Sequence, residues 1–220
     1  MKKIWIIGSG HFGLNALRIL SGNNEKRHFV LVDPVRKNLE QPNCTLEQAD
    51  GAAFLAQHLY PGSEPDWIIP ALPVHLAAEW CLLRMGREQL WRISLPEIKP
   101  LLPNPVRGEA GDIYVSHATF RCPDDCAEPR RTCTVTGKSR KQNMFDILKD
   151  IRFPLFQSLV IRSFQLAPGV GGYAPGQLFE LLNQVKNARN DLLISTACRC
   201  HGVVTGLRRF ECAPPFTHAA

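Results

Sequence analysis

The chain has 220 residues, of which 45% are hydrophobic and 21% charged, a composition typical of a globular protein and not of a disordered one. Its net charge of +6 is too small to indicate a nucleic-acid partner. Residues 101–220 carry 15 basic and 10 acidic side chains and six of the eight cysteines. This shift in composition predicts two domains, 1–105 and 106–220.

Neither a membrane span nor an export signal is expected. No run of about 18 uncharged apolar residues occurs. The N-terminus begins like a signal peptide, but its apolar run ends after four residues at Gly8, and no small-residue cleavage site follows. We therefore expect a cytoplasmic protein, whose cysteines are thiols or metal ligands and not a disulfide framework.

Strands and helices alternate along the first hundred residues. Residues 3–7 are an uninterrupted apolar run, as in a strand buried on both faces, and Leu14, Leu17 and Leu20 then share one helical face. The pattern predicts further strands at 28–32, 44–46, 67–71 and 90–94, and helices at 52–60 and 74–85. This order is typical of an α/β fold with a Rossmann-like, doubly wound parallel sheet.

Residues 8–13, Gly-Ser-Gly-His-Phe-Gly, follow the first predicted strand and begin the first predicted helix. Gly8 permits a tight turn, Gly10 lets the backbone approach a pyrophosphate, and Gly13 allows the helix to pack closely on the strand. The helix dipole attracts the anion. We expect the whole segment, including Ser9, His11 and Phe12, to bind a dinucleotide. The alternative is a glycine-rich turn without a ligand.

Asp33 stands 20 residues after Gly13, at the end of the second predicted strand. There its carboxylate can accept hydrogen bonds from an adenosine ribose, and it would repel a 2′-phosphate. This favours NAD over NADP, although Arg36 and Lys37 could reach such a phosphate.

With these residues, the segment 1–95 resembles the Rossmann-type NAD(P)-binding domains of the saccharopine dehydrogenase and potassium-channel regulatory (RCK) superfamilies. The resemblance implies an acidic residue near the adenine after the third strand, where Asp50 stands; the alternative is that Asp50 caps a helix. Residues 66–75 are also similar to the fourth-strand exit of glucose-fructose oxidoreductase-like dehydrogenases, where a Pro and then a His open the next helix. The Glu-Lys-Pro motif that supplies the catalytic lysine of that family is absent here, and residues 96–100 echo it only loosely.

His75 follows the fourth predicted strand, at the end of a parallel sheet where ligands bind, and is our candidate for a general acid or base. The alternative is a histidine at a helix start with no chemistry. Neither a Gly-x-Ser-x-Gly elbow nor a His-Glu-x-x-His motif is present, so the sequence gives no support to a hydrolase.

Past residue 105 the pattern predicts an α+β domain on a mostly antiparallel sheet, which either packs on the first domain or extends its sheet. Its strands are expected at 113–120, 159–166, 192–199 and 203–209, and its helix at 177–188. The last two strands predict a hairpin that turns near His201. Three glycines at 169–172 form either a loop that lets a ligand approach the backbone or a wide turn.

Three cysteines, Cys122, Cys126 and Cys133, lie in a loop rich in proline and charge, where soft metal ligands can gather. Cys198 or Cys200, which share one face of a predicted strand, can supply a fourth ligand. Other candidates for that fourth ligand are His201 and Cys212. The set predicts a zinc or iron–sulfur centre, and the alternatives are redox-active thiols or unrelated structural cysteines.

The same loop is strongly basic. Its positive charges either attract an anionic substrate or partner or form a solvated surface; they are Arg130, Arg131, Lys138, Arg140 and Lys141. Together the patterns predict an NAD(P)-binding oxidoreductase-like protein with a cysteine-ligated metal centre. The alternative is a non-catalytic nucleotide-sensing or regulatory module that acts through a protein partner.

Overall fold

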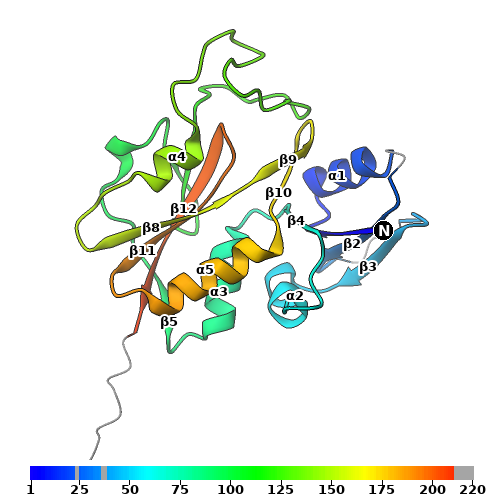
Figure 1. Cartoon of the computed structure of the whole chain (residues 1–220), viewed down its shortest axis with the longest axis horizontal. Coiled ribbons are helices and arrows are strands. Elements are labelled where there is room, and N and C mark those ends of the chain that lie inside the picture. The colour runs from blue at the N-terminus through cyan, green and yellow to red at the C-terminus, as the bar shows by residue number, and fades with distance from the viewer. Residues whose placement is uncertain (23–24, 36–38, 211–220) are drawn as a thin grey trace, which may run out of the picture.

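A computed structural model of the protein describes residues 1–22, 25–35 and 39–210. It is a mixed α/β structure in which a smaller N-terminal sheet lies beside a larger one (Figure 1). The N-terminal sheet consists of β1 (Lys2–Ile7), β2 (Arg27–Asp33), β3 (Cys44–Gln48) and β4 (Trp67–Pro70). These strands lie in the order β3-β2-β1-β4, and all of their pairings are parallel. The first four predicted strands are therefore confirmed.

Helices cover both faces of this sheet. Side chains alternate along a strand, so Ile4 and Ile6 of β1 pack with α1 (His11–Ser21), while Trp5 and Ile7 pack with α2 (Gly51–His58). Figure 1 shows the two helices on opposite sides of the sheet. The predicted stripe of α1 is only partly buried, because Leu14 is 38% exposed.

The larger sheet is mostly antiparallel, as predicted. Its path is β6-β7-β12-β11-β8, and the strands are β6 (Val106–Arg107), β7 (Ile113–Ser116), β12 (His201–Arg209), β11 (Asp191–Ala197) and β8 (Phe156–Arg162). The predicted hairpin is confirmed as β11 and β12, and the one parallel pairing joins β11 to β8. This sheet packs beside the first and does not extend it.

The fifth predicted strand has a different partner from the one expected. β5 (Leu90–Ile93) pairs antiparallel with β12 of the larger sheet and takes no place in the parallel sheet. A short apolar run does not reveal which strand it pairs with. β7 pairs with only the first part of β12, residues 201–204, and β5 pairs with its last part, residues 206–209. The chain therefore passes from one sheet to the other after β4, well before residue 105.

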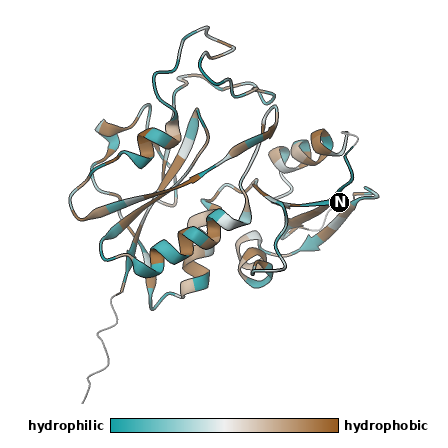
Figure 2. Cartoon of the chain, viewed as in Figure 1, coloured by the Kyte–Doolittle hydropathy of each residue, from teal (hydrophilic) through white to brown (hydrophobic). Residues whose placement is uncertain are grey.

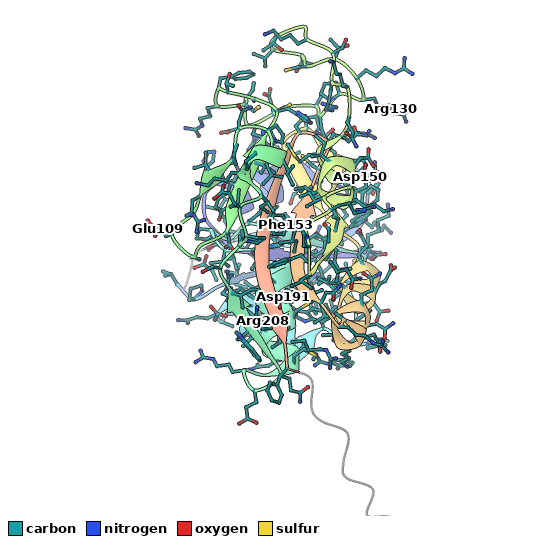
Figure 3. All side chains as sticks on the ribbon, turned by 90° about the vertical axis from the view of Figure 1, so that its left-hand side faces the viewer. Glu109, Arg130, Asp150, Phe153, Asp191 and Arg208 are labelled. Atoms are coloured by element: carbon teal, nitrogen blue, oxygen red, sulfur yellow. The ribbon has the colours of Figure 1, made fainter. Side chains whose placement is uncertain are left out.

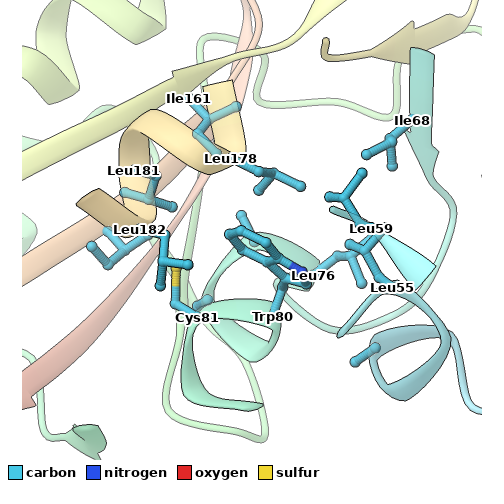
Figure 4. Packing of buried hydrophobic residues seen from close by; sticks show 14 of the residues in the cluster. Leu55, Leu59, Ile68, Leu76, Trp80, Cys81, Ile161, Leu178, Leu181 and Leu182 are labelled. Atoms are coloured by element: carbon cyan, nitrogen blue, oxygen red, sulfur yellow. The ribbon is translucent and has the colours of Figure 1, made fainter. Parts of the chain in front are cut away.

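One apolar core joins the two sheets. Trp80 of α3 (Leu76–Met85) lies between Leu55 and Leu59 from the α2 region and Leu178 of α5 (Pro175–Asn187), as Figure 4 shows. The predicted second-half helix is confirmed as α5, whose hydrophobic and hydrophilic sides are distinct in Figure 2.

Short elements connect these layers. The hairpin β9 (Phe164–Ala167) and β10 (Val170–Gly172) lies against β4 through a bridge between Ile68 and Tyr173. The remaining helices are α4 (Met144–Lys149) and the 3-10 turn Lys99–Leu101. Within the described ranges, none of the helices has the length and apolar character needed to cross a membrane.

Candidate functional site

The glycine turn has the local geometry that its sequence predicts. Gly8 has a φ of +107° and donates its N–H to Val32 O at 2.8 Å. A Cβ on Gly13 would lie 1.9 Å from Gly8 O, so only glycine lets α1 pack this closely on the end of β1. A Cβ on Gly10, by contrast, would meet nothing within 4 Å. The backbone at Gly10 therefore faces open space.

Asp33 lies directly beside this turn. Its Oδ2 accepts a hydrogen bond from the Ser9 N–H at 2.8 Å, and its Oδ1 accepts one from Val35 N–H at 2.9 Å. The carboxylate thus connects the ends of β1 and β2. Arg36 and Lys37, which could influence the choice between NAD and NADP, lie outside the described residues.

Asp50 occupies the N-cap of α2. Its Oδ1 accepts a hydrogen bond from Ala53 N–H at 2.8 Å, which satisfies one of the free amides of the first helical turn. This environment favours the capping alternative, and a contact between Asp50 and adenine stays a prediction.

A loop of the second half, which we call the cysteine loop (residues 120–141), reaches the glycine turn. His11 Nε2 lies 2.8 Å from Asp124 Oδ2, and this contact holds the pKa of Asp124 below its usual range. The loop is largely hydrophilic, and it extends from the larger sheet at the top of Figure 2. Two segments more than a hundred residues apart therefore meet at the start of α1.

Between them lies a pocket of about 370 Å³, which we call the cysteine pocket. Phe12 of α1, 60% exposed, lines it on the side of the glycine turn. The other side is lined by the cysteine loop, the β9–β10 hairpin and the turn between β11 and β12. The chemically active groups among its lining residues are Cys122, Cys126, Cys198, Cys200, His201, Asp124 and Glu128.

The β9–β10 hairpin holds the cysteine loop in place. Gly169 N–H and the Gln165 side-chain amide both donate to Cys126 O, at 3.0 and 2.7 Å. A Cβ on Gly169 would lie 1.6 Å from Asp124 O, and Gly169 has a φ of +74°. Gly169 thus permits close approach to the backbone of the cysteine loop, whereas a Cβ on Gly172 would lie 2.8 Å from Ile68 O of β4; approach of a ligand to these glycines stays a prediction.

Two of the five predicted ligand cysteines lie in turns whose backbone amides point at sulfur. Cys198 Sγ accepts N–H groups from Cys200 and His201, each at 3.3 Å. Cys133 Sγ accepts N–H groups from Val135 and Thr136, and these hydrogen bonds, together with that of the Thr136 hydroxyl, lower its pKa. In both turns the donors are the second and third residues after the cysteine. Hydrogen bonds of this kind stabilise a thiolate, which is the form that binds metals.

The other sulfurs have side-chain neighbours. Cys122 Sγ lies 3.5 Å from His201 Nε2, and Cys198 Sγ lies 3.9 Å from His201 Nδ1. Arg140 Nη1 donates to Cys200 Sγ at 3.0 Å. Burial raises the pKa of Cys198 to about 11. His201, which was only an alternative ligand in the sequence, thus lies between two of the cysteines.

A second pocket, of about 580 Å³, lies on the other side of the cysteine loop. Cys133 reaches this pocket and not the cysteine pocket, whereas Cys122, Cys126 and Cys200 line both. Lys138, Arg140 and Lys141 line it as well, so part of the predicted basic cluster lies beside the sulfurs. Among the described residues, no three His, Cys, Asp or Glu side chains are arranged to hold a metal ion. Cys212 lies outside that part of the chain.

His75 is buried in this structure. It is 3% exposed, and both of its ring nitrogens are taken: Nδ1 lies 2.7 Å from Thr205 Oγ1 and Nε2 lies 2.9 Å from Thr196 Oγ1. Burial lowers its pKa to about 4. This environment favours the alternative of a histidine with no chemistry at the start of α3, and the catalytic role stays a prediction.

Sequence reasoning missed the residues that hold the cysteine pocket together. Glu128 accepts the Arg199 N–H at 2.5 Å, and Gln165 binds the cysteine loop as described above. Each of these contacts joins residues at least 39 apart in the chain, and no local pattern marks either partner.

Comparisons with known proteins show the family of the chain. Residues 77–210 match the model of a family described as AF_1314_C, "Uncharacterized protein, C-terminal domain". The chain belongs to this family. The match begins within α3, after the chain has left the parallel sheet. A protein of Archaeoglobus fulgidus named "Uncharacterized protein" is 31% identical over 219 residues, which cover 93% of this chain and 98% of the relative. No solved structure is significantly similar to the chain.

Proposed function

We propose that this member of the AF_1314_C family is an NAD(P)-binding, oxidoreductase-like protein whose N-terminal unit is Rossmann-like. The strand order β3-β2-β1-β4 with parallel pairing supports this proposal, because β3-β2-β1 is the order of one mononucleotide-binding half of such folds and β4 takes the place of the first strand of the other half. In that order the glycine turn lies where the sheet reverses its direction of growth. Ligands of open parallel sheets bind at such a switch point.

One observation carries the proposal further than the motif alone. The His11–Asp124 contact sets the glycine turn beside the cysteine pocket, so a dinucleotide bound at residues 8–13 would extend toward a pocket of about 370 Å³. Phe12 offers an aromatic face there. The open space at Gly10 leaves room for a pyrophosphate, and Asp33 stands where a ribose hydroxyl would be recognised.

The test is calorimetric titration of NAD into the wild type and Gly10→Val. The Val side chain enters open space, and the backbone at Gly10, with φ of −70° and ψ of −168°, suits it, so the fold is kept while the pyrophosphate position is filled. We expect NAD binding to be abolished. Gly176→Val, which also enters open space, is the matched control and keeps wild-type affinity. Unchanged NAD affinity in Gly10→Val would contradict the proposal.

Asp33→Ala tests the choice of cofactor. Loss of the carboxylate removes both the ribose contact and the repulsion of a 2′-phosphate. We expect the affinity for NAD to fall more than the affinity for NADP. An equal loss of both would count against the assigned role of Asp33.

We also propose that the cysteines hold a metal centre, either zinc or iron–sulfur, with ligands drawn from Cys122, Cys126, Cys133, Cys198 and Cys200. The two turns that direct amides at Cys133 and Cys198 support this part of the proposal, because such amides stabilise a metal-bound thiolate, and at Cys133 they already lower the pKa. Four thiolates from two segments would join the polar loop to the β11–β12 turn. A zinc ion would have a structural role, whereas an iron–sulfur cluster would supply electron transfer.

Anaerobic purification followed by metal analysis and an absorption spectrum tests the metal centre. We expect near-stoichiometric zinc, or iron with a broad band near ~400 nm. Cys126→Ser should lower metal content and melting temperature together, whereas Cys44→Ser, equally half-buried but outside the loop, should leave metal content unchanged. A wild-type preparation without either metal would refute the centre and favour redox-active thiols.

A non-catalytic nucleotide-sensing module is the second candidate. The burial of His75 favours it, because the proposed acid or base is withdrawn from solvent. NAD binding with colourless zinc supports this candidate, and NAD binding with an iron–sulfur spectrum supports the oxidoreductase.

A further inference from the structure

A third pocket lies next to the cysteine pocket and shares Glu128 and Gln165 with it. Its volume is about 400 Å³. Three arginines from three different segments line it, namely Arg130 of the cysteine loop, Arg162 at the end of β8 and Arg199 in the β11–β12 turn. We call it the arginine pocket. Glu128 is the only acidic residue among the described residues that line it, so their positive charge is in excess by two.

The guanidinium group of Arg162 contacts two aromatic rings, which leave its edges available for hydrogen bonding. Its Cζ lies 4.5 Å from the ring centroids of both Phe145 and Phe164. Aromatic rings on a guanidinium bind it by cation–π attraction and leave the N–H groups at its edges as donors. The Nε atom is buried and has no hydrogen-bond partner in the described part of the chain. A buried donor without a partner is costly, so the protein keeps this guanidinium in place against an unfavourable contribution.

The other two arginines of the pocket come from two further segments, and Arg199 Nη1 donates to Asn143 Oδ1 at 3.4 Å. The Glu128 carboxylate accepts the backbone N–H of Arg199 at 2.5 Å, which fixes the turn that carries the Arg199 side chain. Arg130 is exposed at the far end of the molecule in Figure 3. Among the described residues, neither Arg130 nor Arg162 takes part in an ion pair.

We propose that the arginine pocket binds the oxyanion group, a phosphate or a carboxylate, of a small molecule. Guanidinium groups bind both anions through paired N–H···O contacts, and the volume exceeds that of one oxyanion, so part of an organic ligand fits beside it. Because Glu128 and Gln165 line both pockets, the arginine pocket adjoins the cysteine pocket, and the rest of the ligand would extend toward the cysteines. The site does not depend on dinucleotide binding and goes beyond the function proposed above.

The test is calorimetric titration of inorganic phosphate and of malonate at low ionic strength. We expect the wild type to bind at least one of them, and Arg162→Gln and Arg130→Gln each to lower its affinity by about tenfold, the loss expected for one charge-assisted contact. Arg189→Gln is the matched control. It removes the same charge from an exposed position near the start of β11, the strand end remote from Arg162, and should change affinity less than twofold.

The results distinguish a phosphate ligand from a carboxylate ligand, and the arginine pocket from the glycine turn. Tighter binding of phosphate assigns a phosphate ester, and tighter binding of malonate assigns a carboxylate. If Arg162→Gln fails to fold, the affinity of Arg130→Gln tests the proposal alone, because Arg130 is exposed and its substitution should not disturb the fold. Absence of binding to both anions, or an equal loss in Arg189→Gln, overturns the proposal. Loss of phosphate binding in Gly10→Val also overturns it, because phosphate would then be bound at the glycine turn.

Discussion

Two glycines of the same turn meet different physical demands. The Cβ position of Gly13 is filled by the backbone oxygen of Gly8, whereas the Cβ position of Gly10 is empty. Gly13 is therefore required by the packing of α1 on β1, whereas the open space beside Gly10 is available to a ligand. The dinucleotide motif combines a structural requirement and a binding requirement, and the structure separates them residue by residue.

Gly13→Ala should destabilise the fold. Alanine in a helix is favoured over glycine by about 1 kcal/mol, but a contact of 1.9 Å with backbone cannot be relieved by turning a side chain. Overpacking of this kind costs about 1–3 kcal/mol or more, so the net effect is a loss of stability. Urea unfolding measures it. The control is Gly10→Ala, whose new Cβ has no contact, and its free energy of unfolding should lie within about 0.5 kcal/mol of the wild-type value. A Gly13→Ala protein as stable as this control would show that α1 can shift.

At the scale of elements, the sequence predicted most of the long strands and helices better than it predicted their partners, whereas the short elements β6, β10 and α4 were not predicted, and the strand expected at 159–166 is divided between β8 and β9. The apolar runs at β1, β2 and β4 and the stripe of α5 marked real elements, because burial on one or two faces leaves a local pattern. β5 had the same kind of pattern, yet it pairs with β12. Pairing is decided by open edges and chain path, which no window of sequence contains.

The same limit applies to the candidate site. The sequence identified the glycine turn, Asp33 and the cysteines, because each has a local signature. It could not predict that Asp124 would meet His11, or that Gly169 would hold the loop that carries Cys126. Nor could it predict the surroundings of His75: its place after β4 suggests the ligand-binding edge of the parallel sheet, whereas its ring contacts Thr196 of β11 and Thr205 of β12.

Docking of the cysteine loop on the β9–β10 hairpin can be tested by proteolysis. Gly169→Ala introduces a Cβ 1.6 Å from Asp124 O at a positive φ, so the loop must move away and lose the Cys126 contacts. We expect trypsin to cleave after Arg130 and Arg131 several-fold faster than in wild type. Gly176→Ala, which enters open space, should be cleaved at the wild-type rate. Equal rates in both variants would show that other contacts hold the loop.

Across the whole molecule, the two sheets share one core, and a polar network joins α3 to the larger sheet. The core around Trp80 contains residues of both sheets, so neither buries its apolar face alone. The network runs from Thr196 through His75 and Thr205 to Asp112, and from there to Arg92 and Glu79. Because Thr205 donates to Asp112 Oδ1 at 2.6 Å, it accepts from His75 Nδ1–H. Burial lowers the pKa of His75 and so favours the neutral imidazole, whose Nε2 accepts from the Thr196 hydroxyl.

This network predicts that the free energy of unfolding falls in mild acid. The pKa of His75 is lowered by burial from 6.5 to about 4, so the unfolded chain takes up a proton between these pH values and the folded protein does not. Stability from this group is complete above pH 6.5 and is lost as the pH falls toward 4, at up to about 1.4 kcal/mol per pH unit. His75→Gln keeps a donor and an acceptor but does not titrate. Urea unfolding of both proteins between pH 4 and 7.5 should show a steeper loss for the wild type, and parallel curves would mean that His75 does not control acid stability.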